Sequence, residues 1–387
     1  MKVVVFTGCI DLTKKDAKSI YIINILKYLN QIRDLEILLL SPNIPNEIKN
    51  ITHISYFIFN KPHFKFISII IPSLLKLLTN NCDLIHCFDN KSVSIALVAQ
   101  KLKRRKAPII FQLFGLAEAE WKEYAKYSLV DKILGYLWVR MIEDALIKWS
   151  DRLIVLSEAM KIYILKKYPN INKNRIFVAP IGVSIELVKE KDNNKSRILI
   201  DKLGLNNKKV IMYSGWISPL HGVFDLVKAM ELINTEIRDT ALVIVGDGPT
   251  EPLIRKYIRK RQLNNIIFTG RVSHEEILNY YNIADVLVIP HVKCLQTELN
   301  PSTKVLEYFC SGKPIVSSKL KPIVEILGDN AIYVEAKSPK SIAEGVLRVL
   351  KYGEVKERNG KNTKELILKY SWEEIAKRIY EAYVICK

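Results

Sequence analysis

Long uninterrupted apolar runs are absent from this sequence of 387 residues. The most apolar stretch, residues 66–78, is broken by Pro72 and Lys76 and is too short to span a bilayer. It can lie on a membrane surface, and a helix packed on a sheet explains it equally well. Only a handful of apolar residues precede Asp11, so we expect a first strand at the N-terminus rather than a signal peptide.

Cysteine is scarce and scattered. The six cysteines stand at positions 9, 82, 87, 294, 310 and 386, and none forms a CxxC pair. Free thiols in a reducing compartment fit this spacing better than disulfides, so we expect a cytoplasmic protein. A metal site at Cys82, His86 and Cys87 is a weaker alternative, because the same residues read as a buried strand. We therefore expect no metal.

Acidic residues are outnumbered: 40 Asp and Glu face 59 Lys and Arg, for a net charge of +19. Such an excess favours an anionic partner, which can be a phosphate-bearing small molecule, a membrane surface or nucleic acid. The basic clusters at 101–106 and 255–261 are not interleaved with aromatics, and no zinc-finger or helix-turn-helix signal accompanies them. We expect no nucleic-acid partner; each cluster alone is explained by a solvated helix face.

Two α/β units are predicted from the alternation of apolar strands and helical segments. The rhythm stops in a Lys-, Asn- and Asp-rich stretch at 186–209 and then restarts. We expect residues 1–190 to form one doubly wound domain and residues 191–370 a second, with a ligand cleft between them. The last helix, within 371–387, is expected to cross back to the first domain.

A predicted buried strand in the first half, within residues 82–90, places His86 and Asp89 at its carboxyl end. Ligands of open α/β sheets bind at such ends, so both are candidate site residues. The aromatic-rich segment 118–127 follows another strand end. It can line an acceptor cleft or touch a membrane, although an aromatic stripe is more often core.

The stretch Glu298–Val316 organises the second half. We expect a loop with Asn300 and Pro301, then a helix from near Ser302 that carries Lys304 and Glu307 on one face. A helix start with a lysine one turn in favours an anion, and a glutamate beyond it can accept hydrogen bonds from sugar hydroxyls. A capped surface helix with a salt bridge is the alternative.

The second half resembles the retaining GT-B glycosyltransferases of family 4, the "group 1" sugar transferases. The segments that carry the resemblance are YSGWISPLHGVFDLVKAM (213–230), LVIVGDGP (242–249), FTGRVSHEEILNYYNIADVLVIP (268–290) and PSTKVLEYFCSGKPIVSS (301–318). In the first half, CDLIHCFDN, PIIFQLFGL, SDRLIVLSEAM and APIGVS follow in the family's order, and SWEEIAKRIYEAY (371–383) resembles its crossover helix. The resemblance implies two Rossmann-like domains facing across a cleft.

The resemblance also implies roles for residues of the second domain. Glu307 would bind the ribose hydroxyls of a UDP- or GDP-linked sugar, and the segment at Arg271 and Val272 would hold the base. The backbone at Ser302 and Thr303 and the turn at Gly215 and Trp216 would meet the diphosphate.

Several positions depart from the family pattern. The family often has an arginine after the first loop glycine and a lysine before the second, where this chain has Trp216 and His221. Since those cations stabilise the leaving diphosphate, we expect Lys304 to replace them, helped by His221 when it is protonated.

Two further departures concern the sugar and the acceptor. Eight residues before Glu307 stands Leu299 rather than Glu298, so Glu298 receives no donor-sugar role. Phe114 stands where many members have a histidine, which leaves His86 and Asp89 as the candidates for polar contacts near the reacting centre.

The resulting hypothesis is a glycosyltransferase that moves a sugar with retention to a hydroxyl of a lipid-linked or surface glycan, with no cofactor. The basic surface and the apolar helix favour a peripheral place at the inner membrane face. A catalytically silent subunit that binds a nucleotide sugar or a partner enzyme is the alternative, and a GT-B epimerase is a weaker one.

Overall fold

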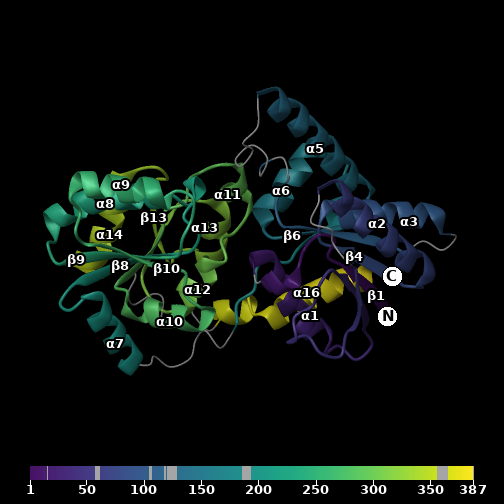
Figure 1. Ribbon diagram of the computed structural model, residues 1–387, viewed down its shortest axis with the longest axis horizontal. Helices are drawn as coiled ribbons and strands as arrows, with labels where there is room; N and C mark the ends of the chain where they lie inside the picture. Colours follow the sequence, from purple (N-terminus) through teal and green to yellow (C-terminus); the bar gives the residue numbers. More distant parts are fainter. Residues whose placement is uncertain are drawn as a thin grey trace. The chain divides into compact units, whose positions relative to one another are not determined.

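The computed structural model describes residues 1–14, 16–56, 62–103, 107–116, 119, 129–184, 193–354 and 365–386, with the side chains of 62–68, 129–134, 193, 274 and 275 left out. The chain forms two compact units, Met1–Gly182 with Trp372–Lys387 and Val183–Ser371 (Figure 1). The unit boundary precedes the predicted one by eight residues, since the chain changes unit after 182 and the expected boundary was 190. Residues 186–192 of the Lys-, Asn- and Asp-rich stretch lie outside the described residues.

The first unit contains a seven-stranded parallel sheet in the order β3-β2-β1-β4-β5-β6-β7. Its elements are β1 (Lys2–Phe6), η1 (Leu12–Lys14), α1 (Ala17–Leu29), β2 (Glu36–Ser41), β3 (Thr52–Ser55), α2 (Pro62–Thr79), β4 (Leu84–Cys87), α3 (Asn90–Leu102), β5 (Ile109–Leu113), α5 (Leu129–Trp149), β6 (Arg152–Val155), α6 (Glu158–Lys167), η2 (Lys173–Arg175), β7 (Ile176–Val178) and α16 (Trp372–Ile385).

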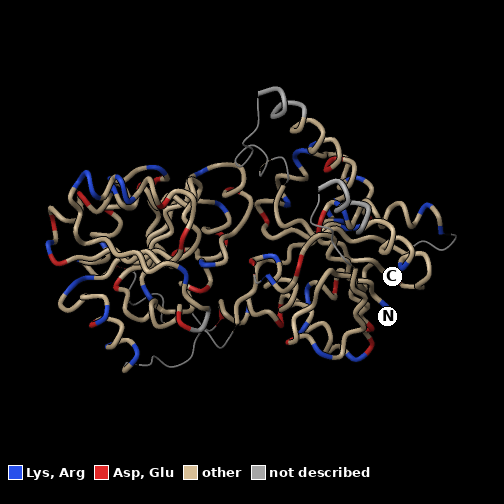
Figure 2. The backbone as a smooth tube through the Cα atoms, viewed as in Figure 1, with Lys and Arg blue, Asp and Glu red and all other residues tan. Residues whose placement is uncertain are grey.

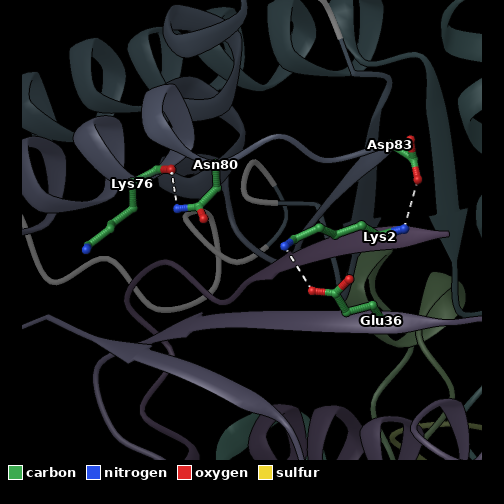
Figure 3. A network of polar contacts seen from close by, with 5 residues as sticks. All are labelled: Lys2, Glu36, Lys76, Asn80 and Asp83. Carbon is green, nitrogen blue, oxygen red and sulfur yellow. Dashed lines mark hydrogen bonds and ion pairs between the residues drawn. The ribbon is translucent and has the colours of Figure 1, made fainter.

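Polar contacts fix the start of the central strand β1 (Figure 3). The backbone N–H of Lys2 donates to the carboxylate of Asp83 at 2.9 Å, just before β4. The ammonium of Lys2 pairs with Glu36 on β2, also at 2.9 Å. These contacts help to fix the register of β1, while its apolar residues supply the burial that stabilises it.

The C-terminal helix α16 belongs to the core of the first unit, as predicted. Trp372, Ile375 and Ile379 are buried there against the sheet and α1. A Cβ on Gly182 would lie 2.5 Å from the Trp372 ring, so the missing side chain allows α16 to pack at this position.

The second unit contains a six-stranded parallel sheet in the order β10-β9-β8-β11-β12-β13. Its elements are α7 (Asn193–Leu203), β8 (Lys209–Ser214), η4 (Pro219–His221), α8 (Val223–Glu236), β9 (Thr240–Val245), α9 (Glu251–Arg261), β10 (Ile266–Gly270), α10 (His274–Ile283), β11 (Val286–Ile289), α11 (Leu295–Leu299), α12 (Lys304–Cys310), β12 (Ile315–Ser318), α13 (Lys321–Leu327), β13 (Ile332–Val334) and α14 (Pro339–Tyr352).

Helices cover both faces of the second sheet. The α8 and α14 pair packs on one face, and α10, α12 and α13 contribute to the core on the other. The central strands β9 and β11 are buried along their whole length, which is why they read as continuous apolar runs. Strand order reverses at β8, which pairs with both β9 and β11, so loops diverge there and leave space for a ligand.

Over the described residues, no helix is both long and apolar enough to cross a membrane. On α2, Ile71 and Leu75 are more than half exposed. The segment 118–127, predicted to line an acceptor cleft, lies outside the described residues except for the buried Ala119. Figure 2 shows Lys and Arg along many elements of both units, including α9, whose basic cluster is the one predicted at 255–261.

Candidate functional site

The helix that carries Lys304 begins later than the sequence pattern predicts. It starts at Lys304 itself, with Thr303 at the N-cap position, and not near Ser302. The expected loop at Glu298 is wrong, because a short helix, α11, occupies Leu295–Leu299. Thr297 closes that helix's N-terminus by accepting from the backbone N–H of Cys294 at 3.0 Å. Asn300 therefore ends α11 instead of capping α12.

Lys304 is buried, with only 6% of its surface exposed. Its ammonium nitrogen donates to the hydroxyl of Tyr213 at 3.2 Å and lies 3.5 Å from Nε2 of His291. Burial lowers the pKa of Lys304 to about 7, and the negative charge of Glu307 opposes this shift. A buried lysine that forms no ion pair with a carboxylate in the part of the chain that the structure describes is not the salt-bridged surface residue of the alternative.

Two histidines stand beside this lysine. The His221 and His291 rings meet edge to face, with centroids 4.9 Å apart, and Nδ1 of His221 lies 2.7 Å from the hydroxyl of Ser218. Burial, with the nearby Lys304 charge, lowers the pKa of His221 to about 3 and that of His291 well below its ordinary value. The expected aid from a protonated His221 is therefore not available in the ligand-free protein at neutral pH.

The sequence reasoning missed His291. It follows β11 by two residues, at the carboxyl end of a strand that neighbours β8. That position, next to the reversal of strand order, was the available signal.

Two glycines allow the loops of this site to approach closely. Gly222 has a φ of +62°, and a Cβ there would stand 1.8 Å from the carbonyl oxygen of Pro290. Gly215 has a φ of +124°, and its Cβ would stand 2.7 Å from the Lys304 ammonium. The loops after β8 and β11 therefore meet backbone to backbone, and the lysine reaches the Gly215 turn directly.

Glu307, one turn beyond Lys304, is half-buried, and its carboxylate accepts from the hydroxyl of Tyr281 at 2.8 Å. That tyrosine also contacts Ser214, the last residue of β8, at 3.0 Å. The carboxylate is thus fixed in direction by a buried neighbour. Ser302 and Thr303 are half-buried and immediately precede α12.

Trp216 follows β8, and Arg271 and Val272 follow β10, two strands that flank β9 in the sheet. The Arg271 guanidinium stands 5.5 Å from the Trp216 ring centroid and pairs with Asp247 at 2.7 Å. Trp216 is 44% exposed and lines an open cavity of about 540 Å³, together with Asp247, Gly248, Glu251, Pro252, Arg255 and Arg259. Val272 packs on the core of the unit. Although Trp216 replaces an expected arginine, a guanidinium therefore lies over it.

The predicted place of His86 is wrong. It lies within β4 and is completely buried, rather than exposed at the strand's carboxyl end. Nδ1 of its ring lies 2.7 Å from the Tyr383 hydroxyl of α16, and the ring packs at a tilt against Phe88, with centroids 4.2 Å apart. Burial lowers the pKa of His86 to about 3. Because the apolar strand continues around it, the side chain faces the core and has no access to a substrate.

Asp89 has a structural role that the sequence analysis did not predict. It is the N-cap of α3, accepting from the backbone N–H of Ser92 at 2.7 Å. Its other carboxylate oxygen accepts from the N–H of Cys9 at 2.8 Å. Both oxygens are thereby used to hold the loop after β1 against α3, which argues against a role as a catalytic base.

Within the described ranges, which include Cys82, His86 and Cys87, no group of three His, Cys, Asp or Glu side chains is placed to hold a metal ion. The weaker alternative of a metal site at these residues is thus contradicted by the structure.

Comparisons with known proteins agree with this arrangement. Residues 195–366 match the family model described as "Glycosyl transferases group 1", and residues 19–187 match that of "Glycosyltransferase Family 4". A protein of Methanocaldococcus jannaschii named as an uncharacterized glycosyltransferase is 25% identical over 301 residues, 75% of this chain and 72% of the relative. The lipopolysaccharide 1,2-N-acetylglucosaminetransferase of Salmonella typhimurium is 27% identical, over 59% of this chain and 61% of its own.

Solved structures show the same fold. The Anabaena protein HepE in complex with UDP superposes with a TM-score of 0.77 at 16% identity, covering 100% of both chains. Sucrose-phosphate synthase from Thermosynechococcus elongatus superposes with a TM-score of 0.76 at 17% identity, covering 100% of this chain and 99% of its own. The predicted GT-B architecture is confirmed.

Proposed function

Because the chain belongs to the group 1 and family 4 glycosyltransferases, we propose that it moves a hexose-type sugar, with retention, from a UDP- or GDP-linked donor to an acceptor hydroxyl. The observation that carries the proposal is the buried Lys304, which faces the Gly215 turn with two histidines beside it and no ion-paired carboxylate among the described residues. Such a pocket of basic groups fits the diphosphate of a sugar nucleotide.

In this proposal, residues of the second unit bind three parts of the donor: the diphosphate, the ribose and the base. Lys304 and the start of α12 hold the diphosphate and stabilise the negative charge that grows on it as the glycosidic bond breaks. Glu307, oriented by Tyr281, accepts hydrogen bonds from the ribose hydroxyls. The loop with Arg271 and Val272 meets the base, and the turn at Gly215 and Trp216 contributes backbone N–H groups.

The reaction itself needs little from the protein beyond positioning and charge stabilisation. The acceptor hydroxyl attacks on the face from which the diphosphate leaves, and a diphosphate oxygen takes its proton. No metal or organic cofactor enters this scheme. Transfer should therefore be unchanged by EDTA, and a loss of activity restored by a divalent cation would remove that part of the proposal.

The base is best tested first with UDP, because HepE has been solved with UDP and with UDP-glucose. A thermal-shift screen against UDP, GDP and their sugars should show a rise in melting temperature with one base and little with the other, since ligands that bind the folded state stabilise it. If none of these nucleotides shifts the transition, the donor assignment fails. Binding without turnover on any acceptor would favour the silent subunit.

The acceptor is proposed to be lipid-linked, at the inner face of a membrane. The net charge of +19 and the exposed Ile71 and Leu75 of α2 support attraction to an anionic surface. Flotation with liposomes containing anionic lipid should carry the protein upward at low salt, and less so at high salt. A protein that stays at the bottom in both would point to a soluble glycan acceptor.

A further inference from the structure

Three basic side chains of the second unit lie together: Lys304 and His291, which are buried, and His221, which is half-buried. Lys304 and His291 are each 6% exposed, and His221 touches His291 ring to ring. Among the described residues, no carboxylate forms an ion pair with any of the three. The titratable groups that face the cluster from the packed elements are Tyr213 of β8, Tyr281 of α10, and Glu307 and Tyr308 of α12.

Among the described residues, Glu307 is the acid whose charge acts on Lys304, and the two form no ion pair. Glu307 acts on Lys304 only at a distance, and its carboxylate accepts from Tyr281 instead. A buried charge without a partner is costly, so the ligand-free cluster favours neutral groups. Each basic group also opposes a proton on the others: the Lys304 charge lowers the pKa of both histidines. The cluster therefore has room for at most one proton until an anion arrives.

We propose that Lys304 is largely a neutral amine in the ligand-free protein at pH 8 and becomes an ammonium when a diphosphate binds, so that each donor bound takes up about one proton from solvent. This inference rests on the proposed function. It also assigns His291, which the sequence analysis did not single out, as the residue that positions the amine. Its Nε2 lies 3.5 Å from the lysine nitrogen, on a loop fixed by the contact between Gly222 and Pro290.

The proton balance is simple. One N–H bond forms on Nζ of Lys304, the proton comes from water or buffer, and no other bond changes. An opposite charge within about 4–6 Å raises a lysine's pKa by about 1–3 units. With a starting pKa of about 7 for Lys304, binding at pH 8 moves the group from mostly neutral to mostly charged. The histidines start too low to follow at this pH, and they act through hydrogen bonds.

The test is calorimetry with UDP-glucose and GDP-mannose at pH 8, in Tris and in HEPES, whose ionisation enthalpies differ. The diphosphate of these probes is doubly esterified and does not titrate near pH 8, so a proton taken up belongs to the protein. We expect an uptake of close to one proton for the sugar nucleotide that binds. Its Kd should rise roughly 5- to 10-fold from pH 7.5 to 8.5 and stay within about twofold from pH 5.5 to 6.5.

Variants separate the lysine from other groups. Lys304→Arg keeps a cation that does not deprotonate, so binding should persist without proton uptake or the loss of affinity at high pH. His291→Gln should change the pH at which the affinity for the sugar nucleotide begins to fall, because Nζ of Lys304 loses its imidazole neighbour. His53→Gln, in the first unit, is the matched control and should leave uptake at the wild-type value.

The outcomes are distinguishable. If neither sugar nucleotide nor UDP or GDP binds, the proposed function falls. If one of them binds to the wild type without proton uptake at pH 8, the inference is overturned while the proposed function stands. Uptake that persists undiminished in Lys304→Arg overturns the assignment to Lys304, and an unshifted pH response in His291→Gln overturns the role of His291.

Discussion

The two units carry polar residues near the central strands of similar parallel sheets, but those residues have different surroundings. In the first unit, His86 is enclosed by Tyr383 and Phe88, and both oxygens of Asp89 accept from backbone amides. In the second unit, Lys304 stands with two histidines at the Gly215 turn and no ion-paired carboxylate among the described residues.

The comparison teaches that position at a strand end does not by itself make a ligand site. In the first unit, both carboxylate oxygens of Asp89 already accept hydrogen bonds and His86 is completely buried, so a ligand would have to displace existing hydrogen bonds or open the core. Lys304, His221 and His291 form no ion pair with a carboxylate of the described residues, so an anion adds an interaction that the fold leaves out. Breaking each arrangement should therefore have a different consequence: loss of chemistry in one unit, and loss of stability in the other.

The largest effect is expected for Lys304→Met, which keeps the buried stem and removes the charge. Transfer should fall about 10²- to 10³-fold in kcat, since a group that stabilises developing charge is lost. The measurement is steady-state transfer from the donor identified by thermal shift. Lys293→Met is the control, because Lys293 is an exposed lysine on the connection between β11 and β12, which also carries Lys304. Activity of Lys304→Met equal to that of the control would end the phosphate assignment.

The next effect concerns the contact that joins the site's loops. Gly222→Ala should destabilise the second unit by about 3 kcal/mol, from backbone strain at positive φ and from overlap with the Pro290 carbonyl. Gly353→Ala is matched, because Gly353 has nearly the same φ of +63° but nothing within 4 Å of an added Cβ. It should cost only the strain, about 1 kcal/mol. Equal losses in urea denaturation would show that the overlap is relieved elsewhere.

A smaller effect than that of Gly222→Ala is predicted in the first unit, for Asp89→Ala. Loss of the cap on α3 and of the bond to Cys9 should lower the free energy of unfolding by about 1–2 kcal/mol. The kcat of the folded fraction should stay within about threefold of wild type. Asp89→Asn, which keeps an acceptor oxygen, should recover part of the stability. A loss in kcat as large as that of Lys304→Met would return Asp89 to the catalytic candidates.

Much of the fold follows from the sequence because burial leaves a direct pattern. The fully buried strands β9 and β11 read as continuous apolar runs, and the amphipathic α16 places Trp372 and Ile379 on one face. Local patterns of this kind depend on neighbours in the chain. The order of these segments also carries the family resemblance, which fixes how the strands pair.

The site is predicted less completely, because its properties come from contacts distant in sequence. Lys304 was found from its place in a motif, but its burial depends on Tyr213, 91 residues away. His291 belongs to no motif and gains its role only when the fold sets it beside His221. The prediction for His86 was wrong because an apolar run does not reveal whether a histidine within it faces the core or the strand end.

The smallest effect tests the buried histidine of the first unit by pH. The unfolded chain protonates His86 below about pH 6.5, whereas burial lowers the pKa of the folded form to about 3. Stability from the neutral ring is thus fully present above pH 6.5 and is lost as the pH falls toward 3. Between pH 7.5 and 5.5, His86 should account for about 1.4 kcal/mol of lost unfolding free energy. Urea denaturation of His86→Gln at both pH values should show a drop in unfolding free energy that is smaller by that amount.

The variant His221→Gln should show a similarly smaller drop in unfolding free energy between these pH values, since burial lowers the pKa of His221 to about 3 as well. Added donor should protect wild type and His86→Gln alike, because the proposed donor site lies at the His221 cluster of the second unit. Donor protection lost in His86→Gln but kept in His221→Gln would reverse the assignment of roles to the two units.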